Sequence, residues 1–253
     1  TVAHRLEHGV TLEVTAEFSD QIGFGSSAAV TVATVAALHA LSRGTVEPRT
    51  VFLSARDLIR TVQGRGSGAD VAASVYGGIV AYRAEPTDLV PIAVSHPFTA
   101  VYSGSKLPTP EVIRIVEERR GLAPEKFEDL FNRMDRCAGE AALAVQREDW
   151  AAFGTLLDQG QQVMEEMGLS NPALDAILHA LRADPGIQGA KISGSGLGDC
   201  AIGLGRPTPP LPLPLPPRRT RPQRTASHLI TQSAPPKPHC TTIARCLRLF
   251  REE

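Results

Sequence analysis

The sequence GFGSSAAVTVATVAALHALS, residues 23–42, places a glycine–serine turn directly before a long run of alanine, valine and leucine. From Ser26 onward the run is too long for a strand, and its alanine content predicts a buried helix. The glycines allow a tight turn and a close approach to a ligand, and Ser26 or Ser27 can cap the helix. The N–H groups and the dipole at such a helix start attract anions, most often phosphate. Taken alone, a capped helix that binds nothing is the commoner outcome.

A second glycine-rich loop, Gln63-Gly64-Arg65-Gly66-Ser67-Gly68, leads to Asp70 and a short apolar run that ends at Tyr76. The run predicts a short helix over 70–76. A carboxylate at a helix start is kept ionised by the helix dipole, which makes Asp70 a candidate for chemistry on a bound ligand. By itself, Asp70 is better explained as a helix cap.

A third loop, Ser193-Gly194-Ser195-Gly196-Leu197-Gly198, joins two segments with strand character, 190–193 and 200–204. Because a strand and not a helix follows it, the loop does not fit the dinucleotide-binding fingerprint. The chain contains neither G-x-x-x-x-G-K-[ST] nor G-x-S-x-G, which excludes a Walker-type phosphate loop and a hydrolase nucleophile elbow.

The sequence up to Gly205 mixes helical and strand patterns, which predicts an α+β protein with two layers, arranged in two lobes. We place an N-terminal lobe at residues 1–93 and a C-terminal lobe at 94–205. Proline near the start of several expected helices costs little, because the missing N–H would have no acceptor there. The other expected strands are 9–18, 77–83 and 98–103, and the other expected helices are 50–62, 109–120, 124–147, 149–167 and 172–183.

Residues 206–253 form a tail of a different composition. The tail holds eleven of the 20 prolines and has a net charge of +7, against −8 for residues 1–205. Such a segment predicts polyproline II or disorder, and the alternative is a docking ligand, since 214–219 fits P-x-x-P-x-R. The acidic body argues against a nucleic-acid partner, and the absence of an apolar run of about 18 residues argues against a membrane span. Four scattered cysteines favour a reducing, cytoplasmic setting.

Together, the three loops resemble the GHMP small-molecule kinases over roughly residues 9–205. The order and the spacing of the loops match that family, although each loop alone is a weak signal. Residues 101–113 and 189–205 are similar to the C-terminal lobe of the mevalonate-pathway branch. The segments that carry the family pattern are Gly23–Ala29, Ser67–Asp70 followed by Gly77-Gly78, and Ser193–Gly198.

The resemblance implies a nucleotide-binding β/α lobe followed by a ferredoxin-like lobe. It also implies an ATP- and Mg²⁺-dependent kinase that phosphorylates the hydroxyl of mevalonate, with phosphomevalonate as the alternative acceptor. A GHMP-like protein that binds nucleotide without catalysis is a further alternative. By this resemblance Asp70 is the base or the orienter of the attacking hydroxyl, and Ser27 helps to hold Mg²⁺. The implied nucleotide-binding residues are Gly23, Gly25, Ser26, Ser27, Ala28, Gly194, Ser195 and Gly196.

The sequence departs from the family pattern in three ways. The family's N-terminal lysine motif would precede Thr1, and the Pro/Arg-rich tail stands where the C-terminal lobe would continue. Many members carry a Glu eleven residues before the catalytic Asp, where this chain has Ile59. Asp57 and Glu47 are nearby acids, but neither is in register, so no acidic Mg²⁺ ligand is assigned. The expected partner is a small molecule, and a homodimer is an open alternative for the assembly.

Overall fold

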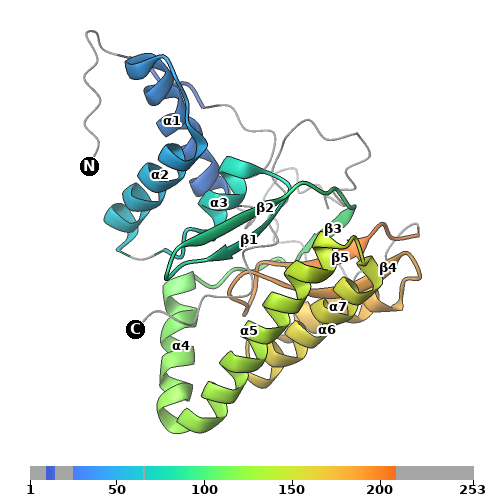
Figure 1. The fold of residues 1–253 in the computed structure, drawn as a ribbon. Coiled ribbons are helices and arrows are strands. Elements are labelled where there is room, and N and C mark those ends of the chain that lie inside the picture. The colour runs from blue at the N-terminus through green and yellow to red at the C-terminus, as the bar shows by residue number, and fades with distance from the viewer. Residues whose placement is uncertain (1–9, 15–24, 65, 209–253) are drawn as a thin grey trace, which may run out of the picture. The chain divides into compact units, whose positions relative to one another are not determined.

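The computed structural model describes residues 10–14, 25–64 and 66–208, and the fold is drawn in Figure 1. The chain forms two compact units, with the boundary between Ala93 and Val94. Each unit has its own apolar core. Gly23 and the tail from residue 209 onward lie outside the described residues.

The first unit consists of three helices and a two-stranded hairpin. The helices are α1 (Ser26–Arg43), α2 (Pro48–Gln63) and α3 (Ala69–Tyr76), and they contact one another. The hairpin pairs β1 (Ile79–Arg83) with β2 (Asp88–Ile92) in antiparallel register. The core that the helices share with β1 consists of Ala28, Val32, Val35, Val51, Phe52, Ala55, Val71, Ala72 and Val80.

Left-handed glycines end the first two helices. Gly44 follows α1 with φ 69°, and Gly64 follows α2 with φ 74°, a backbone conformation that glycine adopts without steric cost. The start of α2 is capped by Glu47, whose carboxylate accepts from the backbone N–H of Arg49 and of Thr50. Gly64 therefore marks where the second glycine-rich loop begins.

The second unit contains a three-stranded antiparallel sheet. Its strands are β3 (Phe98–Tyr102), β4 (Ile187–Ser193) and β5 (Cys200–Gly205), in the order β3-β5-β4. The central strand β5 is close to fully buried, and the third glycine loop joins β4 to β5. The loop is therefore held at one end by the edge strand β4 and at the other by the central strand β5.

Four helices complete the second unit: α4 (Thr109–Leu122), α5 (Pro124–Gln146), α6 (Trp150–Glu166) and α7 (Pro172–Ala183). Figure 1 shows α5, α6 and α7 lying together; α6 and α7 both contact β4, and α5 packs on α6. As expected, α4, α5 and α7 carry proline in their first turn.

The closest approach of a helix to the sheet is made by two glycines. A Cβ atom placed on Gly154 of α6 would lie 2.2 Å from the carbonyl oxygen of Gln188, and one placed on Gly189 of β4 would lie 2.0 Å from the carbonyl oxygen of Gly154. Real Cβ atoms do not approach oxygen that closely, so only glycine permits this backbone contact.

The structure corrects the expected secondary structure in three places. Residues 10–14, the described part of the expected strand 9–18, form no strand, and their valine and leucine side chains are exposed. Strand β2 was not expected, because Pro91 interrupts the pattern of a strand. Helix α1 is buried along one face only, since Val30 and Leu41 are exposed. In the part of the chain that the structure describes, no helix is both long and apolar enough to cross a bilayer.

Candidate phosphate-binding and catalytic site

The start of α1 differs from the expected serine cap. Gly25 is the N-cap residue, with φ 75°, and no side chain caps the helix, so Ser26 and Ser27 already belong to the first turn. The first helical hydrogen bond runs from the N–H of Ala29 to the carbonyl oxygen of Gly25, at 2.9 Å. The N–H groups of Ser26, Ser27 and Ala28 therefore have no acceptor within the helix, which is the arrangement that binds anions at helix starts.

Asp70 lies directly beside this helix start. A Cβ atom built on Gly25 would be 3.7 Å from Cβ and Cγ of Asp70 and 3.8 Å from its Oδ2. Asp70 is in the first turn of α3, but the N-cap residue there is Gly68, so Asp70 is not the helix cap. The structure thus brings together the first two glycine-loop motifs and places a half-buried carboxylate beside the N-terminus of α1.

Ser27 is exposed at the same end of α1, where its hydroxyl accepts a hydrogen bond from Nε2 of Gln63 at 3.3 Å. Among the described residues, no group of three or more His, Cys, Asp and Glu side chains could hold a metal ion. This is compatible with Mg²⁺, because Mg²⁺ in phosphoryl-transfer sites is held by one or two protein groups together with the phosphates of the substrate. Ser27 is suitably placed for that role.

The loop just before Asp70 is bound by two side chains that no pattern in the sequence singles out. Nε of Arg60 donates to the carbonyl oxygen of Gly66 at 2.9 Å, and the hydroxyl of Tyr82 donates to the carbonyl oxygen of Ser67 at 2.5 Å. Because both acceptors are backbone atoms, no pattern of acceptor side chains marks these contacts. The position of Tyr82, in the strand that follows Gly77-Gly78, is the only hint that the sequence offers.

The two nearby acids and the residue at the family's Glu position have other contacts in the structure. Glu47 caps α2, and its pKa is lowered, chiefly by the hydrogen bond with the Thr50 side chain. Asp57 pairs with Arg56 at 3.1 Å. Ile59, at the position where many family members carry a Glu, packs against the apolar core of the first unit.

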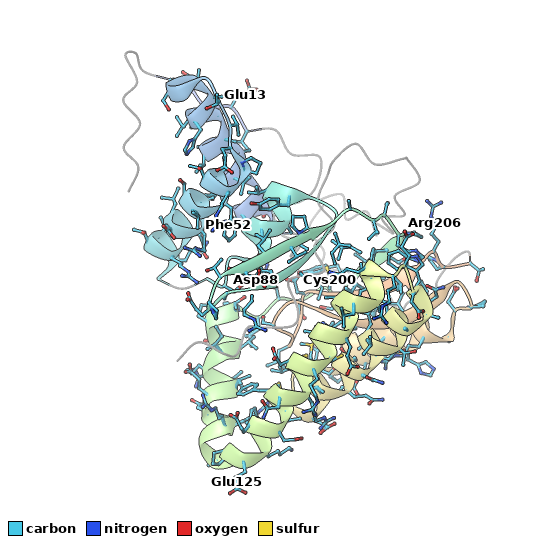
Figure 2. The ribbon with its side chains drawn as sticks, viewed as in Figure 1. Glu13, Phe52, Asp88, Glu125, Cys200 and Arg206 are labelled. Carbon is cyan, nitrogen blue, oxygen red and sulfur yellow. The ribbon has the colours of Figure 1, made fainter. Side chains whose placement is uncertain are left out.

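The third glycine loop belongs to the second unit and has the expected strands on both sides. Figure 2 labels Cys200, the first residue of β5, directly after the loop. Left-handed backbone conformations run through it, at Gly194 (φ 84°), Gly196 (φ 90°), Leu197 (φ 57°) and Asp199 (φ 68°). This chain of unusual conformations explains the glycines, because most other residues are strained there.

Two neighbouring segments hold this third loop through its backbone. The N–H of Leu197 donates to the carbonyl oxygen of Leu169 at 2.7 Å, and the N–H of Asp199 donates to that of Ser105 at 2.6 Å. These two N–H groups are already used and are not open to a ligand. Earlier in the loop, Ser195 is half-buried, while Gly194 and Gly196 are buried.

Lys106 lies close to the end of the same loop. Its Nζ atom is 3.5 Å from Oδ2 of Asp199, and the lysine side chain is 41% exposed. The pKa of Tyr102, at the end of β3, is raised by burial and by the charges of Asp199 and Cys200. Lys106 is therefore a partly exposed cation that is paired with the loop.

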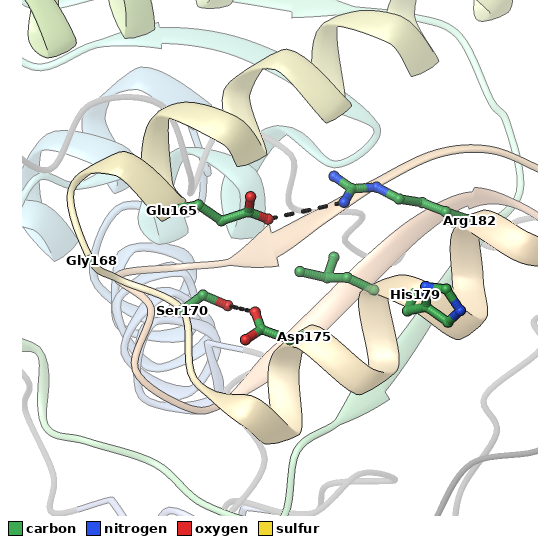
Figure 3. Close-up of a pocket in the computed structure, with 7 residues that line it drawn as sticks. Glu165, Gly168, Ser170, Asp175, His179 and Arg182 are labelled. Atoms are coloured by element: carbon green, nitrogen blue, oxygen red, sulfur yellow. Dashed lines mark hydrogen bonds and ion pairs between the residues drawn. The ribbon is translucent and has the colours of Figure 1, made fainter.

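A separate open hollow of about 480 Å³ lies in the second unit beside the end of α6 and along α7 (Figure 3). None of the residues expected to bind nucleotide lines it. Three charged side chains of its lining already have partners. Asp175 accepts a hydrogen bond from Ser170, and Arg182 pairs with Glu165 and with Asp158, which lies outside the lining. The candidate site therefore remains the start of α1 with Asp70.

Comparison with known proteins agrees with this geometry. A family model described as the N-terminal domain of GHMP kinases matches residues 1–78, and one described as the C-terminal domain matches residues 140–211. A mevalonate kinase of Archaeoglobus fulgidus is 33% identical over 196 residues, which are 78% of this chain and 66% of that protein. A mevalonate kinase of Thermococcus sibiricus is 30% identical over 203 residues, which are 78% of this chain and 60% of that protein.

Among solved structures, an L. major mevalonate kinase in complex with R-mevalonate matches with a TM-score of 0.66 and 29% identity, over 73% of this chain and 57% of that one. The two-unit α+β fold is that of a small-molecule kinase. The chain belongs to the GHMP kinase family. Within that family it is mevalonate kinase-like, which confirms the resemblance and the fold class expected from the sequence. The chain spans 60–66% of the length of the two curated relatives.

Proposed function

We propose that this chain carries out ATP-dependent phosphoryl transfer to the hydroxyl of mevalonate. The observation that carries the proposal is the closeness of Asp70 to Gly25, on which a Cβ atom would lie 3.7 Å from Cγ of Asp70. This puts a carboxylate at the end of α1 whose N–H groups suit phosphate. Phosphoryl transfer needs the donor phosphate and the acceptor hydroxyl to meet at one place, and positioning supplies much of the rate.

In this proposal each residue has a defined task. The N–H groups of Ser26, Ser27 and Ala28 bind the phosphates of the nucleotide, and Asp70 accepts the proton of the attacking hydroxyl or orients it. Mg²⁺, when bound, neutralises charge on the phosphates, and the Ser27 hydroxyl is the group that would hold it. Gly194, Ser195 and Gly196 stay predicted nucleotide-binding residues on the family resemblance alone.

The choice of acceptor is supported by the relatives, which are named mevalonate kinases, and by the structure of one of them with R-mevalonate. A coupled assay of ADP release should be run with mevalonate, phosphomevalonate, galactose and homoserine. We expect turnover to be fastest with mevalonate. Turnover confined to phosphomevalonate would replace this proposal by the alternative acceptor.

A chain that binds Mg·ATP but turns over none of these acceptors would be a nucleotide-binding GHMP-like protein instead. Titration calorimetry with Mg·ATP, run beside the assay, separates this outcome from a chain that binds no nucleotide at all. The cytoplasmic setting and the homodimer stay predictions from the sequence. A size measurement in solution decides the homodimer.

A further inference from the structure

Side chains from two neighbouring elements form hydrogen bonds with the loop just before Asp70. Arg60, in the last turn of α2, and Tyr82, in β1, donate to the carbonyl oxygens of two consecutive loop residues, Gly66 and Ser67, at 2.9 and 2.5 Å. A loop held at two successive peptide units has little freedom to rotate. Asp70 follows three residues after Ser67, in the first turn of α3.

The backbone of the loop also lies directly on these side chains. Gly68, the residue that starts α3, has φ 86°, and a Cβ atom on it would be 2.9 Å from the hydroxyl oxygen of Tyr82 and 3.0 Å from Cγ of Arg56. Tyr82 thus contacts the loop both by its hydrogen bond and by close packing at the N-cap position of α3. The direction in which α3 leaves the loop is set at that contact.

The side chains that contact the loop are held in place by further contacts. The ring of Tyr82 meets the ring of Phe52 edge to face, with centroids 5.9 Å apart, and Phe52 is 2% exposed. The guanidinium of Arg56 lies 5.6 Å from the centroid of Phe52 and donates to Oγ1 of Thr87 at 3.0 Å. Arg60 is further held by an ion pair with Glu85, at 3.5 Å. The anchors are therefore part of the packed unit and do not move independently of it.

We propose that Tyr82 and Arg60 are positioning residues for Asp70, acting through the loop 66–68 that they bind. This inference rests on the proposed function, because it gives Asp70 a task that depends on placement. A base must lie within hydrogen-bond reach of the proton that it takes, and a displacement of about 1 Å can cost a factor of about 10² in rate. Loosening the loop should therefore slow the chemical step more than it weakens nucleotide binding.

The test compares Tyr82→Phe, which removes only the hydroxyl, with Tyr76→Phe, the same change at the far end of α3. Arg60→Lys is the second variant, because it keeps the charge beside Glu85 but removes the Nε donor. For Tyr82→Phe we expect kcat to fall about 5- to 30-fold, which is less than the factor of about 10² expected for a displacement of about 1 Å. The KM for ATP should change less than about twofold. Tyr76→Phe should change kcat less than about twofold. Deuterium uptake at residues 66–72 should rise in Tyr82→Phe and Arg60→Lys, at a temperature where both stay folded.

The outcomes separate this inference from the proposed function. If Asp70→Asn slows turnover but Tyr82→Phe and Arg60→Lys do not, the positioning role is wrong and the kinase proposal stands. If kcat falls no more in Tyr82→Phe than in Tyr76→Phe, the positioning role is likewise wrong. If the wild-type chain turns over none of the acceptors, the kinase proposal fails. Deuterium uptake then tests by itself whether Tyr82 and Arg60 anchor the loop. Unchanged uptake at residues 66–72 then overturns the anchoring, and increased uptake supports it.

Discussion

A Cβ atom on Gly25 would lie 3.7 Å from Cγ of Asp70, so the start of α1 and the first turn of α3 share one corner of the first unit. Gly25 has φ 75°, a conformation that a residue with a side chain adopts only with strain. The corner thus combines a helix end that suits phosphate with a carboxylate that can take a proton. The predictions for Asp70 and Ser27 follow from this pairing.

The first prediction concerns the carboxylate. Asp70→Asn keeps the size of the side chain but removes its charge and its ability to accept a proton, so kcat should fall by about 10²–10⁴. Binding of Mg·ATP should persist, because the phosphates are held by the N–H groups of α1. Asp88→Asn, at an exposed position in β2, is the matched control and should keep full activity. Near-normal turnover in Asp70→Asn would remove Asp70 from the mechanism.

The second prediction concerns the metal. Ser27→Ala should raise the Kd for Mg·ATP about 10- to 150-fold, since a bond to a charged group contributes about 1.5–3 kcal/mol. For ATP without Mg²⁺ the change should be smaller, because the backbone N–H groups remain. Titration calorimetry with and without Mg²⁺ measures the difference. Ser42→Ala is the control, because Ser42 lies at the other end of α1 and donates to Leu38. An equal loss in both conditions would assign Ser27 to phosphate alone.

The third prediction tests the packing of α6 on β4. Gly154→Ala should destabilise the chain by about 3 kcal/mol, because the new methyl group would press on the carbonyl oxygen of Gln188. Gly139→Ala, at an exposed position inside α5 with no atom near the added group, should instead stabilise it by about 0.5–1 kcal/mol. Urea unfolding of both variants measures the two effects, and a small effect of Gly154→Ala would mean that the strand can move away.

Much of the fold could be predicted from local patterns. Helices α1, α5, α6 and α7 are long apolar or amphipathic segments, three of which are marked by a turn residue or a proline at their start, and their bounds lie within a few residues of expectation. Strand β2 could not be predicted, because Pro91 and the exposed residues beside it do not show a strand pattern. The strand is recognised only by its pairing with β1. The expected strand 9–18 is not formed in its described part, residues 10–14, because alternation alone does not make a strand when the described residues pair with no other strand.

The candidate site was predictable only in its glycine loops and in Asp70. Its geometry depends on contacts between residues far apart in the sequence, such as Tyr82 with the carbonyl oxygen of Ser67. Every residue has a backbone carbonyl group, so residue types cannot indicate which carbonyl oxygen accepts the hydrogen bond. The cap of α1 was wrongly expected to be a serine, because Gly25 takes the left-handed conformation and moves both serines into the helix.

The fourth prediction concerns the tail. Thr208 is bound to Asp184 by its N–H and its hydroxyl, both at 3.1 Å, so a truncation after Thr208 keeps the contacts that the structure describes. The proline content and positive charge of the segment beyond it predict that it contributes little to the core. Removing residues 209–253 should therefore shift Tm by less than about 2 °C. Limited proteolysis should cut first at the arginines between 206 and 224. Unfolding of the truncated chain would overturn this prediction.

The fifth prediction is a pH dependence at His96, whose ring stacks on Trp150 with centroids 4.2 Å apart. Burial lowers the pKa of His96, against a smaller opposing effect of a hydrogen bond with Gln188. The unfolded chain, with a histidine pKa of about 6.5, then takes up a proton at a higher pH than the folded chain does. Stability is therefore fully present above pH ~6.5 and falls as the pH drops from there to the lower folded pKa.

Trp150 is the only tryptophan, so its fluorescence reports this site directly. Lowering the pH from 7.5 to 5.5 should lower Tm more in the wild type than in His96→Phe, which keeps an aromatic ring on Trp150 but cannot be protonated. The fluorescence of the folded wild type should change over a pH range below ~6.5, and this change should vanish in His96→Phe. His179→Gln, on the exposed side of α7, is the control and should behave as the wild type. An equal loss of Tm in His96→Phe would show that other groups set the acid sensitivity of the fold.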